Sequence, residues 1–388
     1  MIPRTKVNYS FSQILRSLFI RNGGNTYRAR LISELSEFLG IKHIILTPSG
    51  RSALYILLRA LPQKRVVVPA YTCKAVVESA LLARKEVEYV EVNPQDFNMD
   101  LSLLESVIDS STIVIATHQF GIPCDIRNIC EISSKRGAIV IEDVAAAFGT
   151  KVGGRLVGTF ATSSFYSFDS TKLINVPLKS GFLATNDSDL YERACEIASE
   201  TLRPMSTLRR LLLLGQAFVL LAVENPLFYR CFHKLHFEWR GRFTADSPKL
   251  NIKLTEFYMN EMAEWQACLA CIQLESLDLI IKKRQKVYAE LYAGLQDCPY
   301  IELPPPDRHQ EWSCIRFPIR VRGDKMAFYR EATRKGLDFA FSFTYIAAPE
   351  HMRKSHSIAD AVLDLPFYSK LTDKELAKTI SIVRSIKI

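Results

Sequence analysis

The chain has 388 residues, of which 48% are hydrophobic and 23% are charged, and its formal net charge is +9. This length and hydrophobic content are enough for one large α/β domain and a smaller one, and they exclude a disordered chain. The charge is compatible with nucleic acid, a membrane surface or an acidic substrate, but the basic residues lack repeated aromatic-basic units, so nucleic acid is not an expected partner.

Nine cysteines are scattered along the chain. Cys268 and Cys271 form a CxxC pair without a second one, in a segment whose spacing places both on one buried helix face, so we interpret them as core thiols and expect no metal site. The scatter favours a reducing compartment, and hence the cytoplasm. The basic N-terminus lacks the uninterrupted apolar stretch and cleavage site of a signal peptide, so we interpret it as part of the mature protein.

Short apolar runs alternate with amphipathic segments of helical length in the first half of the chain. This alternation is typical of βαβ units, and it predicts a mainly parallel sheet covered by helices on both faces. The last two runs are too close together for a crossover helix, so one strand there is expected to run antiparallel. The predicted strands lie in 43–50, 65–72, 87–94, 112–121, 138–145, 159–168 and 179–187.

The second half of the chain changes character. Residues 261–295 form one long helical pattern, which is followed by three consecutive prolines and then by strand and helix patterns. We therefore expect a large domain over 1–254, a long connecting helical region over 255–299 and a small C-terminal α+β domain over 300–388.

The large domain contains an apolar and basic insertion at 205–245. The apolar run 211–223 has 13 residues, which is too short to span a bilayer, for which about 20 are needed. Two interpretations of 205–242 remain open. It can lie on a membrane surface with anionic lipids, or it can be a hairpin buried against the active-site mouth or a dimer interface.

Open α/β sheets bind ligands at the loops that follow their strands, and several such loops carry candidate residues. Gly50, Arg51 and Ser52 begin a helix, where backbone N–H groups, the helix dipole and the guanidinium favour an anion such as phosphate. A simple helix cap by Ser49 or Ser52 explains the same residues equally well.

Asp143 and His118 each stand at a strand end. The carboxylate of Asp143 can pair with a protonated heterocyclic nitrogen, although a capping role is favoured on this residue alone. His118 is more often structural, unless a cofactor ring lies beside it.

Lys172 follows the strand predicted at 159–168. A lysine normally titrates near ~10.4, but burial or a neighbouring cation lowers its pKa and leaves an amine that condenses with aldehydes. A solvated turn lysine is the commoner case. However, the phosphate loop, Asp143, Ser167 and Lys172 occur in one βαβ domain, and together they favour pyridoxal phosphate, which needs a phosphate cradle, a carboxylate and a lysine.

From about residue 40 to its C-terminus, the sequence resembles the DegT/DnrJ/EryC1/StrS family of sugar aminotransferases. This resemblance implies the aspartate aminotransferase type of fold (fold type I), with a mostly parallel seven-stranded sheet, pyridoxal 5'-phosphate as cofactor and a homodimer with shared active sites. The motifs that carry it are PSGRSAL, VPAYT, HQFGIPCDI, IEDVAAAFG, SFDSTK, EWQACLACIQLESLD and VLDLPFYSKLTDKEL.

The resemblance also assigns roles. Lys172 matches the catalytic lysine that binds the cofactor, Asp143 matches the partner of the pyridine nitrogen, and Ser167 matches a phosphate ligand. Met259 aligns with the asparagine that reaches the neighbouring subunit's phosphate, so we expect the adjacent Asn260 to take this part.

Three further positions depart from the family pattern. Arg51 replaces a threonine in the phosphate loop, so we expect its guanidinium to replace a hydroxyl. Ala146 replaces a glutamine or histidine, whose contact with the ring hydroxyl must be lost or supplied elsewhere. Cys73 stands where the family often has an aromatic ring over the pyridine, which leaves Tyr71 or His118 as substitutes.

Related sugar dehydratases carry histidine at the lysine position, so Lys172 implies transamination. The expected donor is an amino acid, glutamate in most relatives, and the expected acceptor is a keto- or aldehydo-sugar of the bacterial cell envelope. The basic charge favours an acidic acceptor from lipopolysaccharide synthesis, with 8-oxo-3,8-dideoxy-manno-octulosonate as one candidate. We expect a cytoplasmic enzyme with peripheral contact at the inner membrane through 205–242. The alternative is a non-catalytic relative that acts as a membrane-surface or regulatory scaffold.

Overall fold

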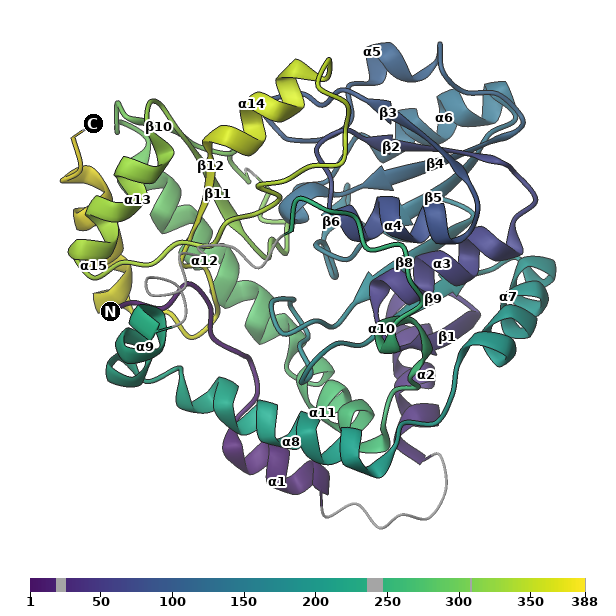
Figure 1. Ribbon diagram of the computed structural model, residues 1–388, viewed down its shortest axis with the longest axis horizontal. Helices are drawn as coiled ribbons and strands as arrows, with labels where there is room; N and C mark the ends of the chain where they lie inside the picture. The colour runs from purple at the N-terminus through teal and green to yellow at the C-terminus, as the bar shows by residue number, and fades with distance from the viewer. Residues whose placement is uncertain (19–25, 236–246, 308, 388) are drawn as a thin grey trace.

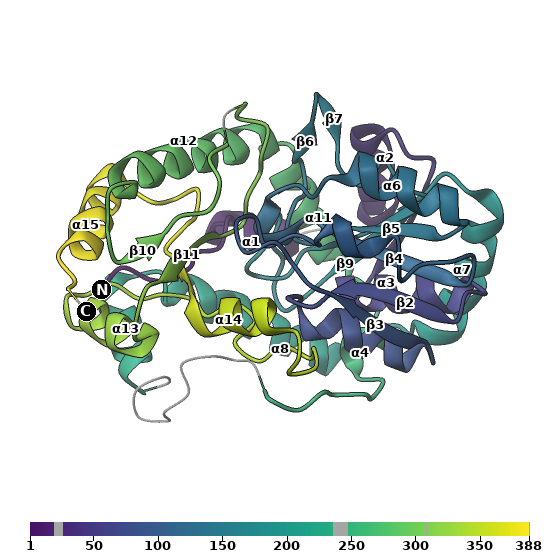
Figure 2. The same ribbon diagram turned by 90° about the horizontal axis from the view of Figure 1, so that it is seen from above.

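The computed structural model describes residues 1–18, 26–235, 247–307 and 309–387. A seven-stranded sheet and a separate three-stranded sheet fit the proposed division into a large and a C-terminal domain (Figures 1 and 2). The strands of the large sheet are β1 (His43–Thr47), β2 (Arg65–Pro69), β3 (Glu86–Val90), β4 (Thr112–Thr117), β5 (Ile139–Asp143), β8 (Ser163–Ser167) and β9 (Gly181–Thr185).

The order of the seven strands is β1-β9-β8-β5-β4-β2-β3. The strands from β8 to β3 pair in parallel, whereas β9 pairs antiparallel with both β1 and β8. The predicted mainly parallel sheet, its seven strands and its antiparallel strand are therefore confirmed.

Helices cover both faces of this sheet, and β4 shows why its sequence is apolar throughout. Ile113 and Ile115 pack into the same core as α3 and α4, while Val114 and Ala116 pack on the other face with α6. Alternate side chains of a strand point to opposite faces, so a strand covered on both sides needs apolar residues at every position. The covering helices are α3 (Gly50–Ala60), α4 (Lys74–Leu82) and α7 (Ser188–Thr201) on one face and α2 (Thr26–Leu39), α5 (Leu101–Leu104), α6 (Ile126–Arg136) and α11 (Glu264–Leu274) on the other.

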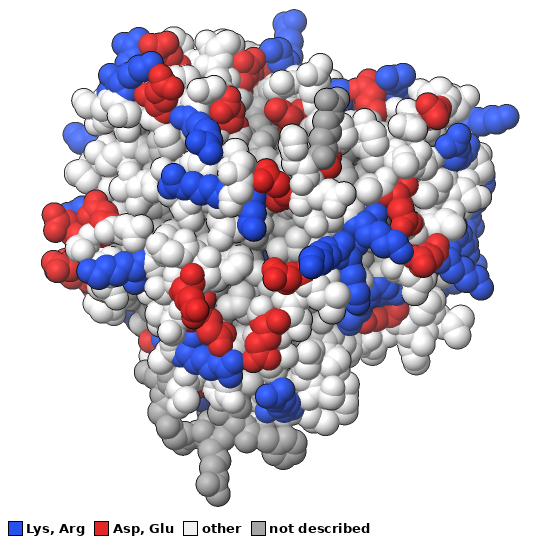
Figure 3. Space-filling view, turned by 180° about the vertical axis from the view of Figure 1, so that it is seen from behind, with Lys and Arg blue, Asp and Glu red and all other residues white. Residues whose placement is uncertain are grey.

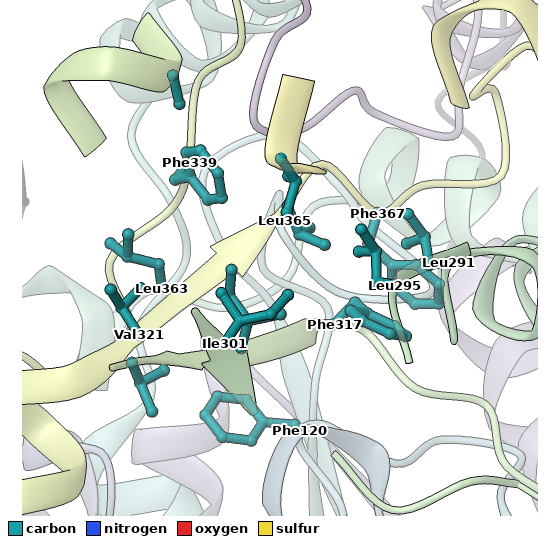
Figure 4. Close-up of a cluster of buried hydrophobic side chains, with 14 of the residues drawn as sticks. Phe120, Leu291, Leu295, Ile301, Phe317, Val321, Phe339, Leu363, Leu365 and Phe367 are labelled. Atoms are coloured by element: carbon teal, nitrogen blue, oxygen red, sulfur yellow. The ribbon is translucent and has the colours of Figure 1, made fainter. Parts of the chain in front are cut away.

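The C-terminal domain is built on an antiparallel sheet in the order β10-β11-β12. Figure 4 shows side chains of these strands and of α12 converging in its core, where Phe120 of the large domain joins them. The elements are α12 (Leu277–Leu295), β10 (Ile301–Glu302), β11 (Phe317–Val321), α13 (Lys325–Arg334), α14 (Arg353–Ala361), β12 (Val362–Leu365) and α15 (Asp373–Arg384). Short elements elsewhere are β6 (Lys151–Val152), β7 (Arg155–Leu156), the 3-10 helix η1 (Gln119–Gly121) and α10 (Glu256–Met259).

The long helical pattern at 261–295 is two helices, so the prediction of one helix is wrong. α11 ends at Leu274 and α12 begins at Leu277, with Ser276 at the non-helical angles φ −106° and ψ 9°. α11 packs on α2 of the large domain, whereas α12 packs on α15 of the C-terminal domain. The start of α12 still packs in the large-domain core through Leu277 and Ile280, so α12 connects the two domains.

The insertion forms α8 (Thr207–Ala222) and α9 (Pro226–His233), which meet at a bend of 110°. Ala217 packs with Ile14 of α1 (Phe11–Leu18) and Leu269 of α11. Arg4, Tyr229 and His233 all contact the buried carboxylate of Asp338, which ties α9 to the C-terminal domain. Within the described ranges no single helix is long and apolar enough to cross a membrane, and only the bent α8–α9 pair approaches that length.

Charges of both signs mix on the face of the molecule opposite to the view of Figure 1. Figure 3 shows Lys and Arg side chains interspersed with Asp and Glu across this face. The net charge of +9 therefore does not form a single basic field there.

Candidate active site

A cavity of about 310 Å³ lies between the large and C-terminal domains. It includes the last residues of β4, β5 and β8, which are Thr117, Asp143 and Ser167. The carboxyl ends of parallel strands are the usual ligand site of an open α/β sheet, so the cavity lies where the sequence predicts a site. The C-terminal domain lines it with Ile315, Arg316, Phe341, Ser342 and Phe343.

Lys172 lines this cavity from the loop between β8 and β9. Asp169 shapes the loop, because its Oδ1 accepts a hydrogen bond of 3.1 Å from the Thr171 N–H. α11 holds the rest of the loop through Gln273, whose Nε2 donates to the Asn175 carbonyl at 2.8 Å and whose Oε1 accepts from the Asn175 N–H at 3.1 Å. Side-chain hydrogen bonds thus fix a loop that has no regular secondary structure.

The surroundings of Lys172 favour its neutral amine. Burial lowers the pKa of the ammonium group, and the charge of Arg316 acts in the same direction, while Asp169 and Asp143 oppose them. Only the neutral amine is nucleophilic. A lowered pKa therefore makes Lys172 better suited to bond with an aldehyde than an exposed lysine.

The N-terminus of α3 forms an anion cradle beside Lys172. Ser49 is the N-cap, and its Oγ accepts from the Ser52 N–H at 3.2 Å. The N–H groups of Gly50 and Arg51 lie in the first turn, where a helix offers no carbonyl acceptor. A Cβ on Gly50 would come within 3.1 Å of the Ser167 Cβ, so glycine allows the Ser167 side chain to lie against the helix start.

Asp143 is almost completely buried at the end of β5, beside Thr117 of β4 and Phe165 of β8. Its Oδ1 accepts a hydrogen bond of 3.0 Å from the Ala145 N–H. Burial raises the pKa of this carboxyl group. A cationic ligand group beside it would restore the ionised form, because a buried charge is tolerated when it is paired.

Three candidate residues do not line the cavity. His118 is fully buried and is bound by Glu142, with 3.2 Å between its Nε2 and Oε2, and by the Cys124 N–H, which donates to its Nδ1 at 3.2 Å. The expectation that His118 lies against the cofactor is therefore wrong. Ser52 is also buried, and its Oγ donates to the Tyr258 carbonyl at 2.9 Å, so it fixes the helix start.

Asn260 lies in a small second cavity beside Met205 and Glu256 instead of the main one. Its proposed reach to a neighbouring subunit stays a prediction. Tyr71 is buried outside the cavity, and its hydroxyl donates to the Ser342 carbonyl at 3.2 Å. Cys73 does line the cavity, but Tyr71 does not supply the missing aromatic ring.

Arg51 lines the cavity, but its guanidinium is engaged elsewhere. Its Nη1 lies 3.3 Å from Oε2 of Glu78. The expectation that this guanidinium replaces the family's hydroxyl at the phosphate is not supported by that ion pair, so the backbone N–H groups remain the main donors of the cradle.

The sequence reasoning missed several cavity residues. Thr72, Thr117 and Gln119 each present a buried polar atom, Oγ1, Oγ1 and Nε2, that has no hydrogen-bond partner within the described part of the chain. Phe120 and Phe343 add aromatic rings, which stack with 6.1 Å between their centroids. The motifs VPAYT and HQFGIPCDI contain Thr72, Gln119 and Phe120, but the sequence assigned them no role. No motif contains Thr117 or Phe343.

These residues fit pyridoxal phosphate. The cradle at Gly50 and Ser167 suits a phosphate, the buried Asp143 suits a pyridinium nitrogen, and Lys172 suits an aldehyde carbon. The unpartnered atoms of Thr72, Thr117 and Gln119 show that the cavity is built for a polar ligand, because buried polar groups in proteins are normally hydrogen-bonded.

Comparison with known proteins identifies the class of protein. The sequence pattern of the DegT/DnrJ/EryC1/StrS aminotransferase family matches residues 4–215 and 255–384. The chain therefore belongs to this family. The segment 216–254, which includes most of the insertion, falls between the two matched ranges.

Individual relatives agree with this result. The chain is 33% identical over 376 residues to the UDP-N-acetyl-3-dehydro-alpha-D-glucosamine 3-aminotransferase of Acidithiobacillus ferrooxidans, an alignment that covers 93% of this chain and 88% of that protein. It is 32% identical over 171 residues to a pleiotropic regulatory protein of Geobacillus stearothermophilus, where it spans only 46% of the relative and 43% of this chain.

A solved structure has the same fold. NtdA from Bacillus subtilis with bound cofactor PMP has a TM-score of 0.73 at 21% identity, covering 99% of this chain and 83% of that one. The expected family and fold class are therefore confirmed, and the family is one of aminotransferases.

Proposed function

We propose that this protein transfers the amino group of an amino acid, glutamate in the first instance, to a keto- or aldehydo-sugar with pyridoxal phosphate as cofactor. The observation that carries the proposal is the convergence of Lys172, Asp143 and Ser167 on one cavity with the helix start at Gly50. The intact set argues against a non-catalytic scaffold, which would not need these residues together.

Each residue has a defined task. The bound cofactor supplies an aldehyde and an electron-accepting ring. The Gly50 and Arg51 N–H groups and the Ser167 hydroxyl would hold its phosphate, and Asp143 would keep a proton on the ring nitrogen. The Lys172 Nζ would hold the aldehyde carbon and would also move the substrate's α-proton as general base and acid, which the lowered pKa of Lys172 favours.

We favour an acidic sugar of lipopolysaccharide synthesis as acceptor, with 8-oxo-3,8-dideoxy-manno-octulosonate as the first candidate. Apart from Lys172, the cavity wall holds three cations, Arg51, Lys179 and Arg316, and two acids, Asp143 and Asp169. This excess of positive charge suits a phosphate together with a second anion. The full-length relative from Acidithiobacillus ferrooxidans is named for a UDP-sugar, so a nucleotide sugar is the competing acceptor.

Transamination has two half-reactions, one with the amino donor and one with the sugar acceptor, and the test follows both. Purified protein with pyridoxal phosphate is expected to change its visible absorbance when L-glutamate is added, and to release 2-oxoglutarate. The protein treated in this way should then aminate the octulosonate aldehyde, with the product identified by mass spectrometry. If glutamate changes the absorbance but only UDP-keto-sugars are aminated, the acidic acceptor is excluded. If pyridoxal phosphate does not bind, the aminotransferase assignment itself fails.

The proposed compartment is the cytoplasm, and the proposed assembly is a homodimer with shared active sites. All nine cysteines are free, including the buried Cys268 and Cys271, which fits a reducing compartment. Asn260 lies outside the main cavity of its own chain, which fits a role in a neighbouring subunit.

We also place the outer face of the α8–α9 insertion on an anionic membrane surface. Leu211, Leu212 and Phe228 expose 60%, 58% and 65% of their surface, and Leu208, Val219 and Leu227 are exposed beside them in the chain. The exposed cations Arg210, Arg230 and Lys234 belong to the same segment. Glu224 is the one acidic residue between 203 and 235. Its Oε2 lies 3.2 Å from the Nζ of Lys370, so this acid is paired. An apolar face with basic flanks and no unpaired acid suits anionic lipids.

Substitution of Leu211 and Leu212 by glutamate is expected to release the protein from anionic vesicles. The wild type should sediment with phosphatidylglycerol vesicles at low salt and not with phosphatidylcholine alone, while the double variant stays in the supernatant and keeps its transaminase activity. Leu279→Glu is the matched control, because Leu279 is an exposed leucine of α12. A different result would assign this face to a second copy of the chain. In that case the wild type would bind neither kind of vesicle, and light scattering would give the double variant a lower molar mass than the wild type.

A further inference from the structure

One guanidinium in the cavity wall has no task in the proposed cofactor site. Arg316 belongs to the C-terminal domain, directly before β11, and 20% of its side chain is exposed. Its charge lies close enough to Lys172 to contribute to that lysine's lowered pKa. Arg316 therefore stands near the reacting end of the cavity.

The other charges of the wall are accounted for. Lys179 lies 3.5 Å from Asp169, and Arg51 lies 3.3 Å from Glu78. Under the proposed function, Lys172 and Asp143 serve the cofactor. This leaves Arg316 as the cation available to a second anion.

Asp364 pairs with Arg316 by charge, without a direct hydrogen bond to its Nε. This Nε lies 3.9 Å from Oδ2 of Asp364, which is beyond hydrogen-bond length. The same Oδ2 already accepts a hydrogen bond from the Ser342 hydroxyl. Within the described residues, no hydrogen bond joins the Nη atoms of Arg316 to a protein group, so the planar fork that binds carboxylates in two places is available.

A second arginine fixes the backbone that carries Arg316. Arg284 of α12 is buried, and its Nη1 donates to the carbonyls of Cys314 and Ile315, at 3.4 Å each, and of Phe367 at 3.2 Å. Burial and the nearby charge of Arg316 lower the pKa of Arg284 to about 10. An anion bound by Arg316 would relieve this repulsion between the two guanidinium groups.

We propose that Arg316 is a substrate-binding residue that receives the carboxylate of the substrates, with Arg284 as the positioning residue behind it. This inference rests on the proposed function and adds the chemical group of the substrate that the protein recognises, a carboxylate. The carboxylate has two sources, the α-carboxylate of the amino donor and the carboxylate of an acidic sugar, which occupy the cavity in turn.

The test compares Arg316→Gln with Arg320→Gln, which changes an arginine of the same strand region that pairs with Glu302. Loss of a charge-assisted pair is worth on the order of 10- to 100-fold in affinity. Arg316→Gln is expected to raise the KM for L-glutamate by this factor and to weaken binding of the unreactive dicarboxylate glutarate equally, measured by calorimetry. Arg316→Lys should recover part of the loss, and Arg320→Gln should leave both values unchanged.

Two arms separate the sources of the carboxylate. A rise in KM for L-glutamate but not for its α-amide assigns the donor, and a rise for the octulosonate aldehyde but not for a neutral keto-sugar assigns the acceptor. Either result supports the inference. Unchanged KM values for both acids, in a variant that binds pyridoxal phosphate normally, would overturn it. Wild type that does not respond to glutamate would instead overturn the proposed function, so the two failures are distinguishable.

Discussion

Replacing Lys172 with alanine is expected to abolish transamination, with a loss of at least about 10³-fold in the rate of the glutamate half-reaction. The side chain supplies both the covalent link to the cofactor and the group that moves the substrate's α-proton, and no other lysine is placed to do either. Lys179 is the other lysine in the cavity wall, and it is paired with Asp169. The measurement is single-turnover absorbance after mixing with L-glutamate.

The matched control is Lys179→Ala, which removes the other lysine from the same cavity. After treatment with sodium borohydride, wild type and Lys179→Ala should retain the cofactor on the peptide that contains residue 172, whereas Lys172→Ala should release it on denaturation. Covalent retention by Lys172→Ala would show that a different lysine binds the cofactor. Circular dichroism of the variant should be unchanged, because the loop is held by Asp169 and Gln273 rather than by the lysine side chain.

The sequence predicted the large sheet and the convergence of Asp143, Ser167 and Lys172 on one cavity, for physical reasons. Buried parallel strands need apolar residues on both faces, so the run at β4 is easily recognised. Asp143, Ser167 and Lys172 lie within a few residues of strand ends, and strand ends meet at one edge of a parallel sheet. Their positions at strand ends were therefore enough to predict that these residues lie close together.

Other features depend on contacts that no local pattern contains. His118 looks equivalent to Asp143 as a strand-end residue, but Glu142 and Cys124 bind both of its ring nitrogens. Arg316 reaches the cavity only because the C-terminal domain packs over the sheet. The break between α11 and α12 at Ser276 has no signal in the sequence, because the helical periodicity continues across it.

The insertion shows a similar limit. Its composition predicted an apolar run among basic residues, and the structure divides the apolar residues into a buried set around Ala217 and an exposed set around Leu211. The neighbours that bury one side, α1 and α11, are about 200 and about 50 residues away in the chain. Hydrophobic periodicity predicts that an apolar face exists, but tertiary packing decides which part of that face remains exposed.

Asp143→Asn is expected to slow the glutamate half-reaction by on the order of 10²- to 10⁴-fold while leaving the fold intact. Asparagine has the shape of aspartate and keeps the oxygen that accepts from the Ala145 N–H, but it lacks the negative charge that holds a proton on the ring nitrogen. Burial raises the pKa of Asp143 in the protein alone, so ionisation of this carboxyl depends on the cation that it pairs with. The measurement is the rate of the absorbance change with L-glutamate.

A cofactor analogue gives the decisive control for Asp143. Pyridoxal phosphate methylated on its ring nitrogen carries a permanent positive charge, which no longer depends on a carboxylate. It should therefore restore a large part of the lost rate in Asp143→Asn and give wild type no gain. If the analogue restores nothing although it binds, Asp143 acts as the cap of the turn at Ala145, and the pyridine nitrogen must be protonated by another residue.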